Sequence, residues 1–466
     1  MKTIFFDLET TDLNFVGQIL NYAFVLVDGD WKTLDVLRGN IKISNVQLPS
    51  IYAILANRVD VIEHQQIAED TEPQAMAKIR AWLDNILENS KDPVKLIGYN
   101  SVKFDVPFLR TSMIRNGINP YHPNLKLADL LHVAQKTATV NPSFQAMLGP
   151  NKSLKLDRLV QLANISTEKQ KHESLADVLI TIELAKHFAA NYGLDVRTYQ
   201  EYEAKKHEKG AIVIKAFPEK DAKYHQDEYT NNKTKARLVC LDYDKNYSLW
   251  IDIDDWAAGK GRDSISWYAK GHSTFFVSGI DNSDEAQDLA LHAKEDLGIF
   301  NLKNFFPERN CDIEQFIYMM KFDESGALTR AIWNNDTTSL KELRSKYGSK
   351  LYMRYLINQD PNVPESVIEN YALYRYGGKL KTNKMDDKSV FVPGVFNPSF
   401  HTTYKELEQQ AKKIATESTK EDSLLAQSLL FFYQQSPIVK IAGNKLLALP
   451  DRQQTILDDL PSHWYK

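Results

Sequence analysis

The segment that decides the fold is TIFFDLET, from Thr3 to Thr10. Its β-prone apolar residues predict a buried strand that ends in acids. Because strand side chains alternate between the two faces of a sheet, Asp7 and Glu9 project from the same face. Two carboxylates at this place are not core residues. The spacing D-x-E is common, however, and solvated acids at a strand end are its ordinary explanation, so the rest of the chain must decide.

The segments that follow alternate between strand and helix patterns. Strand patterns cover Ile19 to Asp28 and Lys95 to Tyr99, and a helical pattern covers Thr71 to Asn89 between them. Past Asp105 the patterns are mainly helical, over Val106 to Asn116, Leu127 to Lys136, Lys155 to Ala163 and Leu175 to Ala190. This alternation predicts an α/β layered unit that closes near residue 195.

The remainder of the chain changes character twice. A polar stretch from Thr198 to Asp221 suits a connection, and a solvated helix followed by a short strand, Ala211 to Ala216, is equally possible. Short β-prone runs separated by turn residues then predict a small β-rich domain, with strands over Ala236 to Asp242, Tyr247 to Ile253 and Ser273 to Val277. Helical patterns return after Ser339, over Glu365 to Tyr374, Tyr404 to Thr416 and Ser423 to Gln434. We therefore divide the chain into residues 1–197, 198–335 and 336–466.

Length and composition agree with several domains. The 466 residues suggest about three domains at roughly 150 residues each. An apolar content of 43% is ample for separate buried cores. The 57 Lys and Arg residues against 61 Asp and Glu residues exclude a histone-like polycation and a highly charged disordered chain. Any nucleic-acid surface must therefore be local.

Cysteine content and hydropathy indicate a soluble, cytoplasmic protein. With only Cys240 and Cys311, the chain has no disulfide framework and no four-cysteine zinc site. One long-range disulfide is the alternative. Asp7 and Glu9 interrupt the apolar start before a signal-peptide core forms, and no apolar run reaches 18 residues. We expect no membrane association.

Further acids occur at two other places where a helix begins. Asp105 follows the strand pattern ending at Tyr99, and a helix N-cap is its simplest role. Asp177 lies in the first turn of a helix whose apolar face includes Leu175, Leu179 and Ile182, and there an interaction with the helix dipole is the simplest role. His172, taken alone, is typical of an exposed loop.

The ordered set Asp7, Glu9, Asp105, His172 and Asp177 resembles the DEDDh family of 3'-to-5' exonucleases. The H-x4-D spacing of His172 and Asp177 is its specific element. The resemblance implies an RNase H-like mixed sheet with flanking helices and a site for two divalent metal ions. Hard cations such as Mg²⁺ and Mn²⁺ prefer carboxylate oxygens, and phosphodiester hydrolysis needs charge neutralised at both the attacking and the leaving oxygen.

The resemblance also implies a role for each residue. Asp7 would contact both metal ions, Glu9 and Asp177 would complete one site, and Asp105 would support the other. His172 is the candidate general base, because an imidazole with an ordinary pKa near 6.5 can accept a proton from water at neutral pH. Mg²⁺ is the expected ion, with Mn²⁺ as a substitute. The expected products are 5'-mononucleotides.

Substrate contacts are weaker matches to the same family. Thr10 matches a residue beside the terminal sugar, and Asn100 and Phe104 match a polar contact and a stacking wedge. An aromatic residue at a strand-to-helix junction is more often part of the core than a base-stacking residue. Lys103 and Arg110 suit phosphate contacts and equally suit solvated helix charges.

Most of the chain, beyond the nuclease signature as well as within it, resembles the bacterial exonuclease I family. Matching segments include Gly98 to Asp105, Ser153 to Leu159, Asn362 to Tyr374 and Phe431 to Tyr433. The resemblance implies a nuclease domain, a small SH3-like β-rich domain and a C-terminal α-helical domain that close over single-stranded DNA. It also implies a monomer that acts in DNA repair or recombination and binds the tail of single-stranded DNA-binding protein. The segment after the aromatic helix, Gly377 to Lys381, departs from the family pattern.

A basic stretch in the last third offers a second indication of nucleic-acid binding. Phosphates attract cations, and bases stack on aromatic rings. Such residues are interleaved here: Lys341, Arg344, Lys346, Tyr347, Lys350, Tyr352, Arg354 and Tyr355. A solvated helix face with core tyrosines explains the same pattern equally well. A shorter basic stretch, Lys379 to Lys384, is typical of a solvated loop.

Two other functions use the same residues. An RNA-trimming or proofreading DEDDh exonuclease would share every catalytic residue, because the acids act on the phosphate and the metal ions and do not contact the sugar that distinguishes RNA from DNA. A catalytically inactive fold could serve as a nucleic-acid-binding scaffold. The scaffold has no need for four acids and His172 in metal-site order, which favours the enzyme.

Overall fold

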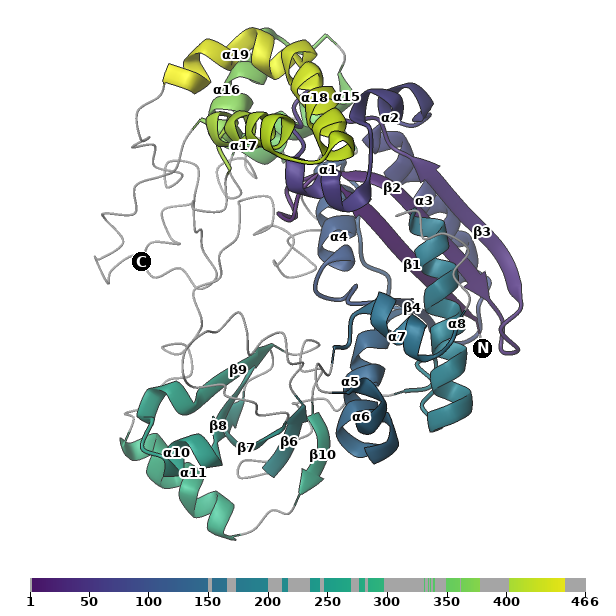
Figure 1. Cartoon of the computed structure of the whole chain (residues 1–466), viewed down its shortest axis with the longest axis vertical. Coiled ribbons are helices and arrows are strands. Elements are labelled where there is room, and N and C mark those ends of the chain that lie inside the picture. The colour runs from purple at the N-terminus through teal and green to yellow at the C-terminus, as the bar shows by residue number, and fades with distance from the viewer. Residues whose placement is uncertain are drawn as a thin grey trace.

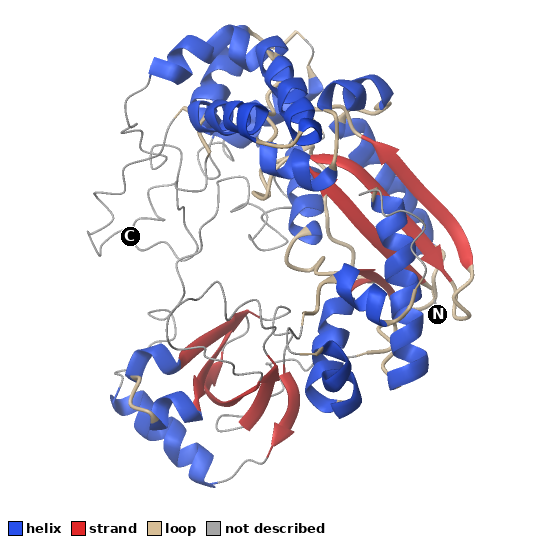
Figure 2. Ribbon diagram, viewed as in Figure 1, coloured by secondary structure: helices blue, strands red, loops and turns tan. Residues whose placement is uncertain are grey.

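The computed structural model describes the greater part of the chain. The described residues are 2–149, 153–165, 173–199, 212–216, 235–243, 247–269, 276–280, 284–296, 331, 334, 336, 338–339, 349–360, 362–377 and 402–448. Figure 1 shows a mixed sheet with helices on both faces, a second sheet with its own helices, and a group of helices from the C-terminal third. Figure 2 separates the same elements by type.

The first sheet contains five strands in the order β3-β2-β1-β4-β5. Strands β2 and β3 run antiparallel to their neighbours, whereas β1, β4 and β5 are parallel. The bounds are β1 Thr3–Thr10, β2 Ile19–Val27, β3 Thr33–Asn40, β4 Val94–Gly98 and β5 Leu125–Asp129. The predicted mixed-sheet α/β unit is confirmed.

Helices cover both faces of this sheet because β1 is apolar on both faces. Ile4, Phe6 and Leu8 pack on one side, and Phe5 packs on the other. The first side is covered by α3 Glu72–Glu88 and α4 Asp105–Arg115. The second is covered by α5 Leu130–Val140, α6 Pro142–Leu148, α7 Leu156–Leu162 and α8 Ser174–Tyr192. Asp7 and Glu9 alternate with Leu8 and so lie on the Phe5 side, toward α8.

The second sheet is antiparallel throughout, with the order β10-β6-β7-β8-β9. Its strands are β6 Ile212–Ala216, β7 Lys235–Tyr243, β8 Tyr247–Asp252, β9 Ile265–Ala269 and β10 Phe276–Ile280. Helix α10, Ile253–Ala257, and helix α11, Asp284–Asp296, flank it. A small core forms between β7, β8 and α11, and it includes Val239, Leu249 and Ala293. The predicted β-rich middle is therefore present.

The C-terminal third contributes five helices within the part of the chain that the structure describes. They are α15 Ser349–Gln359, α16 Glu365–Tyr376, α17 Tyr404–Glu417, α18 Lys420–Gln435 and α19 Pro437–Ala448. Helix α17 begins with a capping box, in which the Thr403 hydroxyl accepts from the Glu406 N–H and the Glu406 carboxylate accepts from the Thr403 N–H. We call these five helices the helical end.

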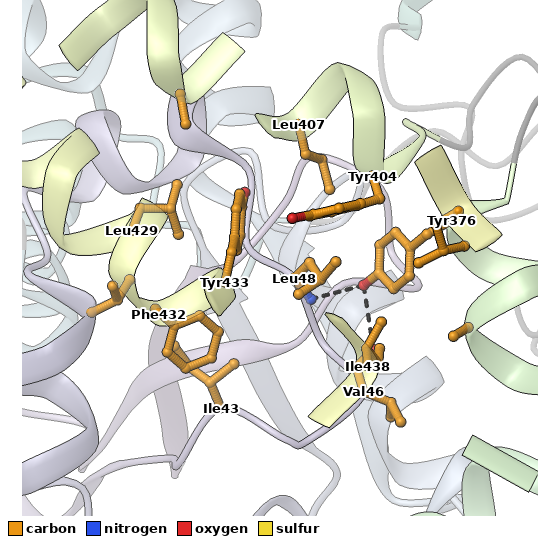
Figure 3. Packing of buried hydrophobic residues seen from close by; sticks show 14 of the residues in the cluster. Ile43, Val46, Leu48, Tyr376, Tyr404, Leu407, Leu429, Phe432, Tyr433 and Ile438 are labelled. Atoms are coloured by element: carbon orange, nitrogen blue, oxygen red, sulfur yellow. Dashed lines mark hydrogen bonds between the residues drawn. The ribbon is translucent and has the colours of Figure 1, made fainter. Parts of the chain in front are cut away.

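The helical end shares its core with a segment of the first unit. This segment includes α1, Ile51–Asn57, and α2, Val61–Ile67. In Figure 3 the Tyr376 hydroxyl accepts from the Leu48 N–H at 2.8 Å and donates to the Val46 carbonyl. The hydroxyl of Tyr433 donates to the Pro49 carbonyl. The expectation of separate cores is wrong here, because the segment from Ile43 to Val61 packs its apolar side chains among the C-terminal helices.

Several local predictions need correction. The helix predicted over Leu127 to Lys136 begins only at Leu130, because residues up to Asp129 pair with β4 as strand β5. Strand β3 was not predicted, since an edge strand with mostly exposed residues has no apolar pattern. Leu179 is 46% exposed, and the buried face of α8 is formed instead by residues that include Val178, Ile182 and Ala185.

Two further expectations concern cysteines and membranes. Cys240 is a free, buried cysteine in β7, and Cys311 lies outside the described residues. Among the described helices, none is long and apolar enough to span a bilayer.

Candidate active site

The candidate site lies where three parallel strands end. Strands β1, β4 and β5 run in the same direction, so their carboxyl ends meet at one edge of the sheet. Open α/β sheets bind ligands outside this edge. Glu9 and Thr10 end β1, Gly98 ends β4 and Asp129 ends β5. The first turn of α8 adds Asp177 from the face that packs on β1.

Three carboxylates converge at this edge. One oxygen from each of Asp7, Glu9 and Asp177 can be chosen so that all three atoms lie within 4.8 Å of one another. The expectation that the strand-end acids are not core residues is wrong for Glu9, which is only 9% exposed. Its neighbours in the cluster are the carboxylates of Asp7 and Asp177.

Burial and mutual repulsion change the protonation of this cluster. Burial, followed by the negative charge of Asp177, raises the pKa of Asp7 to about 8. Burial raises the pKa of Glu9 to about 9, and the charges of Asp7 and Asp177 add to the effect. Carboxylates held this close cannot all ionise unless a cation compensates them. The donor set therefore fits a divalent metal ion.

Asp105 belongs to the same electrostatic group. It is 4% exposed, and burial followed by the charge of Asp7 raises its pKa. Its predicted N-cap role is wrong by one residue, because Phe104 is the N-cap and Asp105 is the first residue of α4. Without an N-cap role toward the following turn, the carboxyl group is available to the cluster.

A residue that sequence analysis did not identify holds the loop before Asp105. Asp129 is 1% exposed, and its carboxylate accepts from the N–H groups of Asn100, Val102 and Leu131 at 2.8, 3.0 and 3.0 Å. Asn100 adopts a left-handed conformation with a φ of 61°. The sequence does contain a signal for Asp129, because this acid directly follows a β-prone run and precedes a helix. The helix predicted over Leu127 to Lys136 covered this position and hid the signal.

The polar substrate-contact candidates lie at the same edge. Thr10 is 5% exposed, and its hydroxyl donates to the Asp12 carbonyl at 2.9 Å. Its carbonyl accepts from the Asn57 amide at 2.8 Å. Asn100 is exposed in the loop that Asp129 holds. Lys103 is exposed three residues farther along this loop.

The side chains of the other two substrate-contact candidates, Phe104 and Arg110, already make contacts within the protein. Phe104 is half-buried, with its ring centroid 5.0 Å from that of Phe108 and 6.4 Å from that of Phe15. The guanidinium of Arg110 lies 5.0 Å from the centroid of the Tyr121 ring. Phe104 therefore contributes to packing, as the more common explanation of an aromatic residue at this junction predicts.

Three candidate residues lie outside the described residues: His172, Lys341 and Arg344. The basic stretches of the last third lie mostly outside them as well. Arg354, however, is described and fully buried, with an Nη atom 3.7 Å from Glu72. It is therefore not a surface phosphate contact.

Comparison with known proteins agrees with this site. The family model described as exonuclease, RNase T, matches residues 4–185, which include the four clustered acids. Residues 4–185 are therefore similar to this family, and we refer to them as the exonuclease domain. The comparison with curated proteins found no match.

Solved structures of exonuclease I extend the likeness beyond the exonuclease domain. E. coli exonuclease I in complex with a 5cy-dA13 oligonucleotide matches with a TM-score of 0.64 and 15% identity, over 93% of this chain and 99% of that chain. A moderately thermophilic exonuclease I from Methylocaldum szegediense matches with a TM-score of 0.63 and 14% identity, over 94% and 99%. A structure described as an ExoI/SSB-Ct complex matches with a TM-score of 0.60 and 15% identity, over 93% of this chain and 99% of that chain.

These comparisons confirm the resemblance inferred from the sequence. The likeness to exonuclease I concerns the fold, and it covers nearly the whole of both chains. The exonuclease domain has a mixed sheet, and its acids meet at the carboxyl edge of the parallel strands. Asp7, Glu9 and Asp177 could hold a metal ion at this edge.

Proposed function

We propose that the chain is a 3'-to-5' exonuclease that degrades single-stranded DNA to 5'-mononucleotides. The observation that carries the proposal is the convergence of Asp7, Glu9 and Asp177 within an exonuclease-family domain. The four acids share one sheet edge, where Glu9 and Asp105 are buried, and their charges repel one another. This arrangement costs stability without a cation, and it suits a protein whose working form holds metal ions.

Asp7, Glu9, Asp105 and Asp177 would hold two Mg²⁺ ions, with Mn²⁺ as a substitute. Bound ions of this kind supply positive charge to the phosphate and lower the pKa of water. The carboxylates contribute hard oxygen ligands that are fixed by β1 and by the starts of α4 and α8.

The other residues would bind and orient the strand end. His172 is the proposed general base, five residues before Asp177 in the sequence. Thr10 and Asn100 would face the terminal nucleotide, and the open side of Phe104 would stack on its base. Lys103 and Arg110 would contact phosphates near the cluster, whereas Lys341 and Arg344 would contact the strand farther from it.

The rest of the chain, residues 198–466, would hold the strand. We assign residues 1–197 to the nuclease domain, 198–335 to an SH3-like domain and 336–466 to a helical domain. The exonuclease I fold over most of the chain supports this division. The oligonucleotide complex of E. coli exonuclease I and the ExoI/SSB-Ct complex support single-stranded DNA and the tail of single-stranded DNA-binding protein as partners. We propose a cytoplasmic monomer that acts in DNA repair or recombination.

The decisive experiment compares three 5'-labelled oligomers with Mg²⁺: single-stranded DNA, blunt duplex DNA and single-stranded RNA. We expect a ladder that shortens from the 3' end on single-stranded DNA alone. The ladder should disappear in EDTA and in the Asp7→Ala variant. Asp30→Ala is the matched control, since Asp30 is an exposed acid in the turn between β2 and β3.

Each alternative has its own outcome. Equal or faster loss of RNA would favour an RNA-trimming enzyme that shares the same acids. Tight DNA binding in EDTA, together with no cleavage of any oligomer in Mg²⁺ or Mn²⁺, would favour a scaffold. Asp7→Ala should retain DNA binding in EDTA, because removing a carboxylate relieves repulsion of the phosphate.

A further inference from the structure

A short loop follows the catalytic strand and is held internally. The Asp12 Oδ1 atom accepts from the N–H groups of Leu13 and Asn14 at 2.7 and 3.3 Å. The Asn14 carbonyl accepts from the Gly17 N–H at 2.7 Å. Gly17 is required here, since a Cβ atom would lie 2.8 Å from Asp12 Cβ and 2.9 Å from the Asn14 oxygen. The loop, residues 10–18, is thus a compact unit attached to Glu9 and Thr10.

Two buried arginines bind this loop from outside. Arg115, the last residue of α4, is fully buried and donates to the Val16 and Gly17 carbonyls at 2.9 and 2.8 Å. Arg375, from α16 of the helical end, is 2% exposed and donates from Nη2 to Asp12 Oδ2 at 3.3 Å. One arginine therefore holds the far side of the loop and the other holds its start.

The arginine at the far side is also linked to the helical end. Glu72 of α3 accepts from Arg115 Nε with both carboxylate oxygens at 3.1 Å. The same carboxylate lies 3.7 Å from Arg354 of α15 and accepts from the Asn358 amide at 3.0 Å. Both attachments of the loop therefore lead to α15 and α16. Ionic contacts this deeply buried hold a defined geometry, because displacement leaves a charge without compensation.

We propose that Arg375 is a positioning residue for the nuclease reaction, acting through Asp12 to hold residues 10–18. Its guanidinium fixes the segment that continues directly from Glu9 and Thr10, and so aligns the terminal nucleotide with the carboxylates. The helical end thereby controls cleavage at a distance from the acids. The effect of Arg375 on cleavage, which we call the catalytic half of the inference, rests on the proposed nuclease function. Its hold on residues 10–18 does not.

The contact can be removed from either side without disturbing the loop itself. Arg375→Gln removes the charge but keeps a polar side chain, and Arg375→Lys keeps the charge without the planar fork. Asp12→Asn keeps Oδ1 as the acceptor for Leu13 and Asn14 and changes only the atom that faces Arg375. The matched control is Arg58→Gln, which removes a different ion pair to the helical end, with Asp422 of α18.

Steady-state cleavage of single-stranded DNA gives the first readout. We expect Arg375→Gln to lower kcat between about 10-fold and about 100-fold, as small misplacements of reacting groups do. KM and DNA binding in EDTA should stay within about 2-fold of wild type, and Arg375→Lys should recover part of kcat. Asp12→Asn should match Arg375→Gln, with the double variant no slower than the slower single variant. Arg58→Gln should leave kcat unchanged.

Hydrogen–deuterium exchange of peptides that cover residues 8–20 gives a readout without activity. Arg375→Gln should increase exchange in this segment, whereas Arg58→Gln should not. Unchanged exchange, unchanged kcat or additive losses in the double variant would overturn the proposal. If the wild-type protein cleaves nothing, the proposed function and the catalytic half fail together, and the exchange result alone decides whether Arg375 holds the loop.

Discussion

Asp129 accepts a hydrogen bond from the Asn100 N–H at 2.8 Å and thereby ties the end of β5 to the loop that leads to Asp105. The other oxygen of the same carboxylate accepts from the Val102 N–H at 3.0 Å. Asp129 thus positions Asn100, which has a left-handed backbone conformation, and Asp105, which is a buried catalytic candidate. Asp129 need not touch the substrate to do so. The loop depends on this acid most strongly at Val102, whose N–H group is buried.

The first prediction follows from the number of donors that Asp129 satisfies. Asp129→Ala removes the acceptor of three N–H groups, and the buried Val102 N–H alone should cost about 1 to 3 kcal/mol. Asp129→Asn places an NH₂ group against one of the N–H donors, so we expect it to impair cleavage as well. Both variants should lower kcat more than they weaken DNA binding, measured by cleavage kinetics and by binding in EDTA.

The control for Asp129 is another buried capping acid. Asp252 caps α10 by accepting from the N–H groups of Asp254 and Asp255, in the second sheet. Asp252→Ala should lower the free energy of unfolding by about 0.5 to 2 kcal/mol and leave kcat unchanged. An equal loss of kcat in both alanine variants would show that Asp129 acts through stability alone.

The second prediction concerns the pH dependence of stability without metal. The pKa values of Asp7 and Glu9 rise to about 8 and about 9 in the folded protein, from 3.8 and 4.5. The folded state therefore binds more protons than the unfolded state between these limits, and stability falls as pH rises through that window. The free energy of unfolding in EDTA should decrease from about pH 4 to about pH 9.

Removing one acid should flatten this pH profile. Asp7→Asn should be more stable than wild type at pH 8 in EDTA, because it removes a buried charge and its repulsion. Mg²⁺ should stabilise wild type more strongly as pH rises, since metal ligands must be deprotonated. Denaturant titrations at several pH values measure both effects. A metal-free profile identical to that of Asp7→Asn would contradict the prediction.

The third prediction separates stacking from packing at Phe104. This ring is half-buried against Phe108, which is itself fully buried. If its open side stacks on the terminal base, Phe104→Ala should weaken DNA binding by about 1 to 3 kcal/mol. Phe108→Ala should instead cost about 3 to 5 kcal/mol of stability. Fluorescence anisotropy in EDTA and denaturant titration give the two quantities, and unchanged DNA binding in Phe104→Ala would assign its ring to packing alone.

The sequence predicts most of the exonuclease domain because its signals are local. Strands β1, β2 and β4 are apolar runs, and Asp7 and Glu9 lie within β1 at a spacing that places them on one face. The resemblance to the DEDDh family, rather than any single spacing, indicates Asp7, Glu9, Asp105 and Asp177 as a set. The raised pKa values of Asp7, Glu9 and Asp105 follow from burial and from distances across the sheet edge, which no local pattern contains.

The features that sequence reasoning missed depend on contacts between distant residues. Asp129 was assigned to a helix, and its three donors come from residues that lie up to 29 positions away. Arg375 and Asp12 are separated by 363 positions. Arg354 was grouped with surface cations, although Glu72 compensates it in the interior. In each case the partner, rather than the residue itself, decides the role.

The last prediction tests whether the helical end and the exonuclease domain unfold together. Leu429 of α18 is fully buried in the core that α1 and the Ile43–Leu48 segment share with the C-terminal helices (Figure 3). Leu429→Ala should lower the free energy of unfolding by about 2 to 5 kcal/mol. Leu424→Ala, on the same helix at a 56% exposed residue, should change it by less than about 0.5 kcal/mol. Because one core joins the two parts, loss of cleavage activity and loss of far-UV circular dichroism should have the same denaturant midpoint in wild type and in Leu429→Ala. A helical transition that precedes loss of activity would show that the shared core does not couple them.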